Sequence, residues 1–281
     1  MAGQFKVIII GAGNKGATGL VSHAKAFSEQ PFHTVGFVDT AAEKAKGAAE
    51  KWGGEAFTDI NAAFERLGAV DVVTVATPDD THEAILNQLI GKPAKLIFAE
   101  KPLCQSSDVA RHLLQTLHAY QQSVAVNYTR RFDRKFSDLK RFVPIWGNLL
   151  GGTAFYTKGL HNLCHWVDLF LMAGVDPEAI HYVEIDRSKL NVFDSLLFFE
   201  KGRLDVTKIG TEWRFTRACD RIDFPEKILG DVTEGPIPDW LKTPMQNAAA
   251  NIASHLQNGA PLLSPGENAV KVLEICERIL A

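Results

Sequence analysis

Residues 6–16 read KVIIIGAGNKG, an apolar run followed at once by glycines spaced as GxGxxG. The apolar run does not alternate with polar residues, so it predicts a strand buried on both faces of a parallel sheet. Glycines at these places suit a tight turn into a helix, whose free N–H groups and positive dipole end can bind a pyrophosphate. The stretch therefore predicts the opening strand, turn and helix of a doubly wound α/β domain.

The glycine motif has the context that a dinucleotide site requires. Gly11 is expected to form the tight turn, Gly13 to let the backbone approach the pyrophosphate, and Gly16 to let helix and strand pack closely. Asp39 ends the next predicted strand, where a carboxylate can bind the adenosine ribose and repel a 2′-phosphate. NAD is therefore favoured, and two lysines just downstream leave NADP open. The alternative is a set of ordinary turn glycines and a solvated aspartate.

Strand and helix patterns alternate over the first 130 residues, which implies right-handed crossovers and a doubly wound sheet. The predicted strands are Lys6–Gly11, Thr34–Asp39, Asp71–Thr77, Lys95–Glu100 and Ser123–Asn127. The predicted helices lie near Lys15–Glu29, Ala41–Trp52, Asp79–Ile90 and Ser107–Ala119. We expect residues 1–126 to form this NAD(P)-binding Rossmann domain and residues 127–281 to form a second domain.

Strand patterns cluster together after the boundary and predict an α+β domain on a predominantly antiparallel, open-faced sheet. The run LLFFEKGRLDV, residues 196–206, predicts a hairpin that turns at Lys201-Gly202. Predicted helices lie near His161–Met172, Pro244–Gln257 and Glu267–Leu280. Alternate apolar residues, namely Leu197, Phe199 and Val206, are expected on the sheet face that no helix covers. Such a face usually finds a partner, so we expect a homodimer or homotetramer through this sheet.

The composition is that of an ordinary globular protein, with 46% hydrophobic residues, a formal net charge of −3 and a pI of about 6.3. A mildly acidic chain without basic blocks lacks the clustered positive charge that is typical of nucleic-acid-binding proteins. No apolar run approaches the roughly 18 residues of a membrane span, and the first residues do not resemble a signal peptide. The cysteines (Cys104, Cys164, Cys219 and Cys276) lie far apart and suit buried thiols in the cytoplasm better than disulfides or a zinc site.

Two further motifs complete a recognisable pattern. Residues 75–78 read VATP with His82 shortly after, and residues 99–103 read AEKPL. This sequence resembles the Gfo/Idh/MocA oxidoreductase family, because it combines a first-strand GxGxxG, a strand ending in TP with a nearby histidine, and EKPL. That family includes glucose–fructose oxidoreductase and inositol dehydrogenase. Residues 258–279 are also similar to the family's C-terminal end, so the resemblance covers nearly the whole chain.

The resemblance implies an NAD(P)-dependent dehydrogenase or reductase that acts on CH–OH groups. It would transfer a hydride between nicotinamide and a carbinol or carbonyl of a sugar, cyclitol or nucleotide-sugar-like substrate. Lys101 would lie beside the nicotinamide and contact the substrate. In residues 161–168, HNLCHWVD, the family's acid–base histidine falls on His165 and the aspartate of its HxxD continuation on Asp168. His161 stands where the family has an aspartate, which puts the substrate contacts in doubt more than the reaction type.

The residues themselves are compatible with this chemistry. Imidazole has an unperturbed pKa of about 6.5 and suits proton transfer near neutrality. We therefore expect His165 to be the general base and Lys101 to polarise the substrate or relay the proton. His161 and His165 are spaced i, i+4 and can share a helical face. Two alternatives remain, a zinc site on HxxxH that lacks a third ligand, and polar residues packed between domains.

Ligands of open α/β sheets bind at the carboxyl ends of the strands, so Asn127 is expected near the nicotinamide or substrate. Together with the positions that the resemblance implies, this completes the candidate sets. The predicted cofactor-binding set is Gly11, Gly13, Asn14, Lys15, Gly16, Asp39, Thr40, Thr77, Pro78, His82, Glu100, Lys101 and Asn127. The predicted substrate-binding set is Lys101, Tyr128, Arg130, His161, Asn162 and His165. Arg130 or Arg131 can bind an anionic group bidentately, or can form ordinary ion pairs. The resemblance also implies a cis Lys101–Pro102 peptide bond, against a trans proline that ends the strand.

Two other functions are compatible with the same motifs. One is a reductase of a non-sugar planar substrate, because biliverdin reductase resembles the family. The other is a dinucleotide-binding regulator without catalysis, like the yeast galactose-pathway repressor. The presence of Lys101 and His165 argues for an enzyme, whereas His161 at the aspartate position argues for the regulator.

Overall fold

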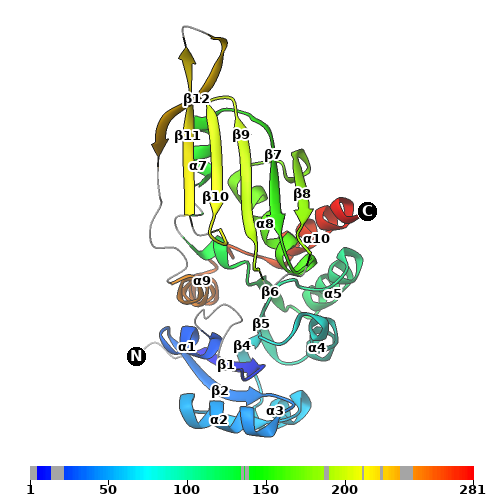
Figure 1. The fold of residues 1–281 in the computed structure, drawn as a ribbon. Coiled ribbons are helices and arrows are strands. Elements are labelled where there is room, and N and C mark those ends of the chain that lie inside the picture. The colour runs from blue at the N-terminus through cyan, green and yellow to red at the C-terminus, as the bar shows by residue number, and fades with distance from the viewer. Residues whose placement is uncertain are drawn as a thin grey trace. The chain divides into compact units, whose positions relative to one another are not determined.

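The computed structural model describes residues 5–13, 22–133, 136, 139–186, 190–210, 212–221, 224–234 and 243–281. The chain forms two compact units (Figure 1). Unit 1 comprises Met1–Phe132 and Leu241–Glu274, and unit 2 comprises Asp133–Trp240 and Ile275–Ala281. Within the described residues, no helix is both long enough and apolar enough to cross a membrane.

Unit 1 is built on a six-stranded parallel sheet with the strand order β3-β2-β1-β4-β5-β6. The strands are β1 (Phe5–Ile10), β2 (Phe32–Val38), β3 (Glu55–Phe57), β4 (Val70–Val75), β5 (Ala94–Ala99) and β6 (Ser123–Val126). The order reverses between β1 and β4, as in a doubly wound sheet. The side chains of residues 7–10 are at most 3% exposed, because the strand is covered on both faces. The predicted Rossmann architecture is confirmed.

Helices and turns connect these strands close to the predicted positions. They are α1 (His23–Ser28), α2 (Ala42–Trp52), α3 (Ile60–Leu67), η1 (Asp79–Thr81), α4 (His82–Leu89), α5 (Ser107–Ala119) and η2 (Thr129–Phe132). Strand β3 and helix α3 were not predicted from the sequence. A three-residue strand is too short to show a period, and the eight residues of α3 begin at a local cap, where the Ala62 N–H donates to Asp59 Oδ1 over 2.9 Å. The first part of the helix predicted at 15–29 lies outside the described residues.

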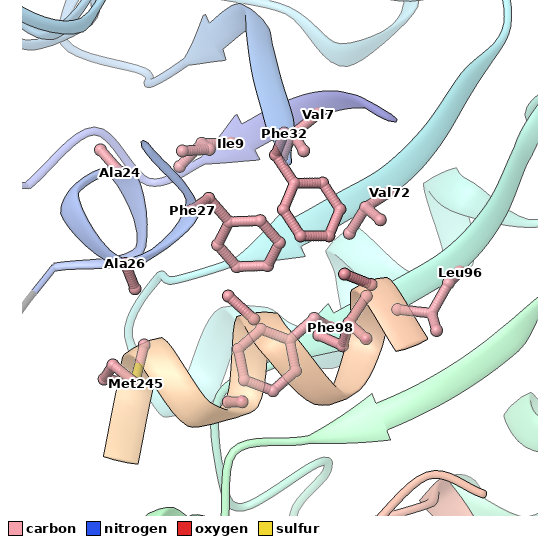
Figure 2. Close-up of a cluster of buried hydrophobic side chains, with 14 of the residues drawn as sticks. Val7, Ile9, Ala24, Ala26, Phe27, Phe32, Val72, Leu96, Phe98 and Met245 are labelled. Carbon is pink, nitrogen blue, oxygen red and sulfur yellow. The ribbon is translucent and has the colours of Figure 1, made fainter. Parts of the chain in front are cut away.

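Helix α9 (Pro244–Asn258) packs in the core of unit 1, although it is more than 100 residues away from β6 in sequence. Its buried face joins Phe27 and Phe98 in one hydrophobic cluster (Figure 2). This segment was predicted to belong to the second domain, residues 127–281. Sequence periodicity shows that a helix has an apolar face but does not show which sheet covers that face. The return of the chain to unit 1 at α9 could therefore not be predicted.

Unit 2 is built on a second six-stranded sheet with the order β12-β11-β10-β9-β7-β8. The strands are β7 (Leu149–Tyr156), β8 (Ile180–Glu184), β9 (Phe193–Phe199), β10 (Gly202–Thr207), β11 (Glu212–Arg221) and β12 (Phe224–Glu234). All neighbouring pairs are antiparallel except β7 with β8. The helices are α7 (Leu139–Trp146), α8 (Leu160–Ala173), η3 (Pro177–Ala179) and α10 (Gly266–Leu280), which begins in unit 1. The predicted α+β class is confirmed.

The β9–β10 hairpin forms as predicted, with its turn one residue earlier. Phe199 pairs with Gly202, so Glu200 and Lys201 are the two turn residues. Gly202 has φ +155°, and a Cβ there would lie 2.2 Å from the Thr216 carbonyl oxygen. A glycine is therefore needed at the start of β10, because the neighbouring strand approaches its backbone closely.

The prediction of which face of this sheet lies open was wrong. Leu197, Phe199 and Val206 are at most 3% exposed and lie in the core. On this face the Trp146 ring of α7 contacts Phe199, with ring centroids 5.4 Å apart. The opposite face carries Phe198, which is 40% exposed. Alternation along a strand separates two faces but does not say which of them the helices cover.

Three of the four cysteines are buried, and Cys219 is exposed. Burial, together with the nearby Glu83 carboxylate, raises the pKa of the Cys104 thiol to about 12. Burial likewise raises the pKa of Cys276, with Cys164 nearby contributing. Thiols with raised pKa values are poor nucleophiles. These buried cysteines therefore act as packing residues.

The position of α9 predicts the effect of a mutation. Ile252 is fully buried in the unit 1 core, so Ile252→Ala should lower the free energy of unfolding by about 2–5 kcal/mol. Urea denaturation followed by circular dichroism measures the change. Leu263→Ala is the matched control in the same unit, because Leu263 is 51% exposed. Equal stabilities of the two variants would contradict the packing of α9 on this core.

Candidate functional site

The carboxyl ends of the unit 1 strands form one continuous edge, because backbone hydrogen bonds continue past the strands. The Gly11 N–H donates to Val38 O (2.8 Å), and the Ala76 N–H donates to Ile10 O (2.8 Å). Further along, the Glu100 N–H donates to Val75 O (2.9 Å), and the Asn127 N–H donates to Ala99 O (2.8 Å). The edge therefore gathers the predicted residues of five strand ends, which are Gly11, Asp39, Thr77, Glu100, Lys101 and Asn127.

Gly11 is required by the geometry at the end of β1. Its φ is +92°, and a Cβ would lie 2.4 Å from the Ala76 carbonyl oxygen and 3.0 Å from Thr77 Cγ2. The glycine thus lets the turn after β1 pass directly against the end of β4. Gly13 is exposed, and a Cβ there would meet no described atom within 4 Å. The predicted partners Asn14, Lys15 and Gly16 lie outside the described residues.

The Asp39 carboxylate links the end of β2 to the glycine turn. Its Oδ2 accepts a hydrogen bond from the Ala12 N–H (3.0 Å), and its Oδ1 accepts one from the Ala41 N–H (2.9 Å). A carboxylate oxygen has lone pairs for more than one donor. Asp39 can therefore stabilise the turn and still accept from a hydroxyl group. Thr40, also predicted to contact cofactor, is exposed beside it.

His82 has a different role from the one predicted. The side chain is fully buried, with Nδ1 2.7 Å from Pro102 O and Nε2 3.0 Å from Thr77 O. Both ring nitrogens face backbone carbonyls, so His82 holds two loops of the edge together and presents no nitrogen to a ligand. In the first of these loops Pro78 is exposed, and the Thr81 hydroxyl lies 2.7 Å from Pro78 O.

Glu100 is held by two side chains. Its Oε1 lies 2.9 Å from His23 Nε2 and accepts a hydrogen bond from Asn127 Nδ2 (2.7 Å). Burial raises the pKa of this carboxyl, but the hydrogen bond and charge of His23, the Asn127 hydrogen bond and the Lys101 charge outweigh it and lower the pKa overall. His23 was not predicted as a site residue, because a histidine within a predicted helix gives no indication of its hydrogen-bond partner.

Lys101 and Asn127 are buried at the same edge, with 6% and 3% exposure. The Lys101–Pro102 peptide bond is cis, as the resemblance implies. Asn127 Nδ2 also lies 3.0 Å from the sulfur of Met245 on α9. Asn127 Oδ1 is buried and finds no hydrogen-bond partner among the described residues.

Two predicted substrate-binding residues of unit 1 are buried. Tyr128 is fully buried, and its carbonyl oxygen accepts a hydrogen bond from the Arg131 N–H (2.9 Å). Arg130 is 8% exposed, whereas Arg131 is half-buried. Tyr128, just before η2, and Arg130 within it are therefore both buried, and Arg131 is the more accessible of the two arginines.

In unit 2, α8 carries the predicted catalytic histidines on one face. The rings of His161 and His165 are perpendicular, with centroids 6.5 Å apart, and both side chains are half-buried. His165 also packs edge-on against Phe193 of β9 at 6.3 Å. Asn162 is half-buried on the first turn, and Asp168 is 1% exposed one turn beyond His165. Among the described residues, no group of three or more His, Cys, Asp or Glu side chains could hold a metal ion.

Sequence comparison finds a family model and relatives that each match part of the chain. The model of the GFO_IDH_MocA oxidoreductase family, with an NAD-binding Rossmann fold, matches residues 5–128. Inositol 2-dehydrogenase of Rubrobacter xylanophilus is 30% identical over 147 residues, 51% of this chain and 41% of that protein. The enzyme of the same name from Corynebacterium glutamicum strain R is 29% identical over 168 residues, 58% of this chain and 47% of that protein. The matches thus span less than half of either relative.

Structure comparison finds the same fold over the whole chain. The WlbA dehydrogenase from Bordetella pertussis, in complex with NADH and UDP-GlcNAcA, has a TM-score of 0.76 and 13% identity, covering 100% of this chain and 95% of that chain. An inositol dehydrogenase homolog from Azotobacter vinelandii, complexed with NADH and myo-inositol, has a TM-score of 0.73 and 14% identity, covering 99% and 95%. At these identities the likeness is one of fold.

The close approach at Gly11 predicts how two glycine variants differ. Gly53 also has a positive φ, +84°, but a Cβ there would meet nothing within 4 Å. Gly53→Ala should lower the free energy of unfolding by about 1–3 kcal/mol through backbone strain alone. Gly11→Ala should lower it further, because the new methyl group also overlaps the Ala76 carbonyl. Thermal and urea denaturation measure both changes, and equal losses would show that the contact with β4 is unimportant.

Proposed function

We propose that this chain is a Gfo/Idh/MocA oxidoreductase, the family whose model matches residues 5–128, and that it is an NAD(P)-dependent dehydrogenase acting on CH–OH groups. The observation that carries the proposal is the edge of the unit 1 sheet. There a glycine turn, the Asp39 carboxylate and the buried Lys101 side chain follow β1, β2 and β5 of one parallel sheet. That combination suits a dinucleotide whose nicotinamide end reacts beside a cation.

The described residues fit such a cofactor. The turn at Gly11–Gly13 would hold the pyrophosphate, and Asp39 would accept hydrogen bonds from the adenosine ribose hydroxyls. Asn127 Oδ1, a buried acceptor without a described partner, would accept from the carboxamide of the nicotinamide. NAD is favoured over NADP because the Asp39 carboxylate repels a 2′-phosphate. When bound, the nicotinamide supplies or accepts the hydride.

The side chains of this chain would bind the substrate and move its proton. The Lys101 ammonium would donate a hydrogen bond to the reacting oxygen and stabilise negative charge on it. An imidazole nitrogen of His165 would take the hydroxyl proton of the carbinol during oxidation and return it during reduction. His161 and Asn162 on the same helix would hydrogen-bond further substrate hydroxyls, with His161 in place of the aspartate of the family.

We propose a polyhydroxylated substrate of the sugar, cyclitol or nucleotide-sugar type. The relatives named above are inositol 2-dehydrogenases, and the structural neighbours were solved with myo-inositol or UDP-GlcNAcA. A hydroxyl-rich substrate suits paired imidazoles and an amide, which can each donate or accept a hydrogen bond.

A two-step experiment tests the proposed function. NADH and NADPH are first titrated into the protein and followed by fluorescence, with NADH expected to bind more tightly. Oxidation of cyclitols, sugars and nucleotide sugars is then followed by absorbance at the nicotinamide band. Tight NADH binding without turnover of any substrate would favour a dinucleotide-binding regulator. Binding of neither nucleotide would contradict the proposal.

The assignment of His165 predicts a loss of turnover without a loss of cofactor affinity. His165→Ala should lower kcat by about 10²–10⁴-fold, the usual contribution of a general base. The dissociation constant of NADH should stay unchanged. His181→Ala is the control, because His181 is exposed on β8 of the same unit. A His165→Ala variant with the turnover of the wild type would rule out the assignment.

We further propose that the open face of the unit 2 sheet forms a homo-oligomeric interface. Phe198 is 40% exposed there, with the ion-paired Arg203 and Asp205 (3.1 Å) on the neighbouring strand. Phe198→Asp should convert the oligomer to a monomer in sedimentation experiments, because it places a charge in the buried interface. Leu280→Asp, at an exposed residue of α10, should leave the assembly unchanged. A wild-type monomer would contradict this proposal.

A further inference from the structure

Three polar side chains of unit 1 form a chain from α1 to the end of β6, with buried His23 and Asn127 on either side of the half-buried Glu100. His23, the first residue of α1, is 6% exposed, and its ring packs against Phe98 with centroids 5.3 Å apart. Its Nε2 lies 2.9 Å from Glu100 Oε1, and the same oxygen is 2.7 Å from Asn127 Nδ2. One carboxylate oxygen therefore joins the helix after the glycine turn to the strand end that carries Asn127.

The protonation of Glu100 fixes the direction of both hydrogen bonds. The pKa of this carboxyl is lowered, because His23, Asn127 and the Lys101 charge outweigh the effect of burial, so the group is a carboxylate at neutral pH. A carboxylate can only accept hydrogen bonds. His23 must therefore donate from Nε2, and the amide nitrogen of Asn127, not its oxygen, must face Glu100.

The amide of Asn127 is consequently oriented by its surroundings. Nδ2 faces both Glu100 and the Met245 sulfur, so Oδ1 is directed away from them. Oδ1 is buried and has no hydrogen-bond partner among the described residues. An unsatisfied buried acceptor is costly, and a bound donor would remove that cost. The carboxamide N–H of a nicotinamide is such a donor.

We propose that His23 is a positioning residue for the nicotinamide end of the cofactor and acts through Glu100. By donating to Glu100, His23 holds the carboxylate where it orients Asn127, so that Oδ1 is presented to the carboxamide. This inference rests on the proposed binding of NAD. It adds a residue of the first helix to the recognition of the nicotinamide, whereas the glycine turn before that helix serves the pyrophosphate.

Two ligands separate this role from a structural one. NADH and ADP-ribose share the adenosine and pyrophosphate groups, but ADP-ribose lacks the nicotinamide. If His23 merely anchors α1, its loss weakens both ligands equally. If His23 positions Asn127, its loss weakens NADH alone. The ratio of the two dissociation constants is therefore the quantity to measure, by isothermal titration calorimetry with the full chain.

His23→Leu removes the hydrogen-bond donor at similar side-chain volume. It should raise the dissociation constant of NADH by about threefold to tenfold, equivalent to one hydrogen bond. ADP-ribose affinity should change less than twofold. His23→Gln supplies a side-chain N–H at a comparable reach and should recover part of the loss. His33→Leu is the control, because His33 is exposed on β2 of the same unit. Melting temperatures of all variants show whether they are folded.

A double-mutant cycle tests whether His23 acts through Glu100. Glu100→Gln should weaken NADH binding in the same way. Adding His23→Leu to it should cause little further loss of NADH affinity, because the two residues act as one unit. Three outcomes would each overturn the inference. They are additive losses of NADH affinity in the double mutant, equal losses of NADH and ADP-ribose affinity in His23→Leu, and no loss of NADH affinity in His23→Leu. If the wild-type protein binds NADH no more tightly than ADP-ribose, Asn127 does not recognise the nicotinamide. If it binds neither ligand, the proposed function fails and the inference with it.

Discussion

The register of the parallel sheet in unit 1 is the constraint on which the candidate site depends. Each strand ends beside its neighbour, and the first N–H of the following loop still donates to a strand carbonyl at 2.8–2.9 Å, as at Gly11, Ala76, Glu100 and Asn127. The loops therefore leave the sheet at one level. Side chains that are far apart in sequence reach the same edge without any adjustment of the strands, which is how an open α/β sheet builds a ligand site.

Charged and polar side chains at this edge connect neighbouring loops through hydrogen bonds. Asp39 accepts from the glycine turn, His82 lies between the carbonyls of Thr77 and Pro102, and Glu100 receives His23 and Asn127. Buried polar groups are tolerated where they have partners, and each of these interactions fixes a loop relative to its neighbour. Asn127 Oδ1 is buried at this edge and finds no hydrogen-bond partner among the described residues, so it has capacity for a ligand.

The sequence was sufficient for features that depend on local pattern. Continuous apolar runs predicted β1, β4 and β5, and the GxGxxG motif predicted the glycine turn. The cis Lys101–Pro102 bond was implied by the family resemblance. Features that depend on packing between distant segments could not be predicted. Helix α9 joins the first core, Leu197 faces inward rather than outward, and His82 is fully enclosed. His23 was missed for the same reason, since its partner Glu100 is 77 residues away.

The central claim is that the edge of the unit 1 sheet binds a nicotinamide dinucleotide. Hydrogen–deuterium exchange of the full chain with and without NADH tests it most directly, because it reports where the ligand protects the backbone. The account predicts slower exchange in the segments that contain Gly11–Gly13, Ala76–Pro78 and Lys101–Leu103. It predicts little change in β12, at the far end of the unit 2 sheet order. Unchanged exchange at the three strand ends in the presence of saturating NADH would contradict the claim.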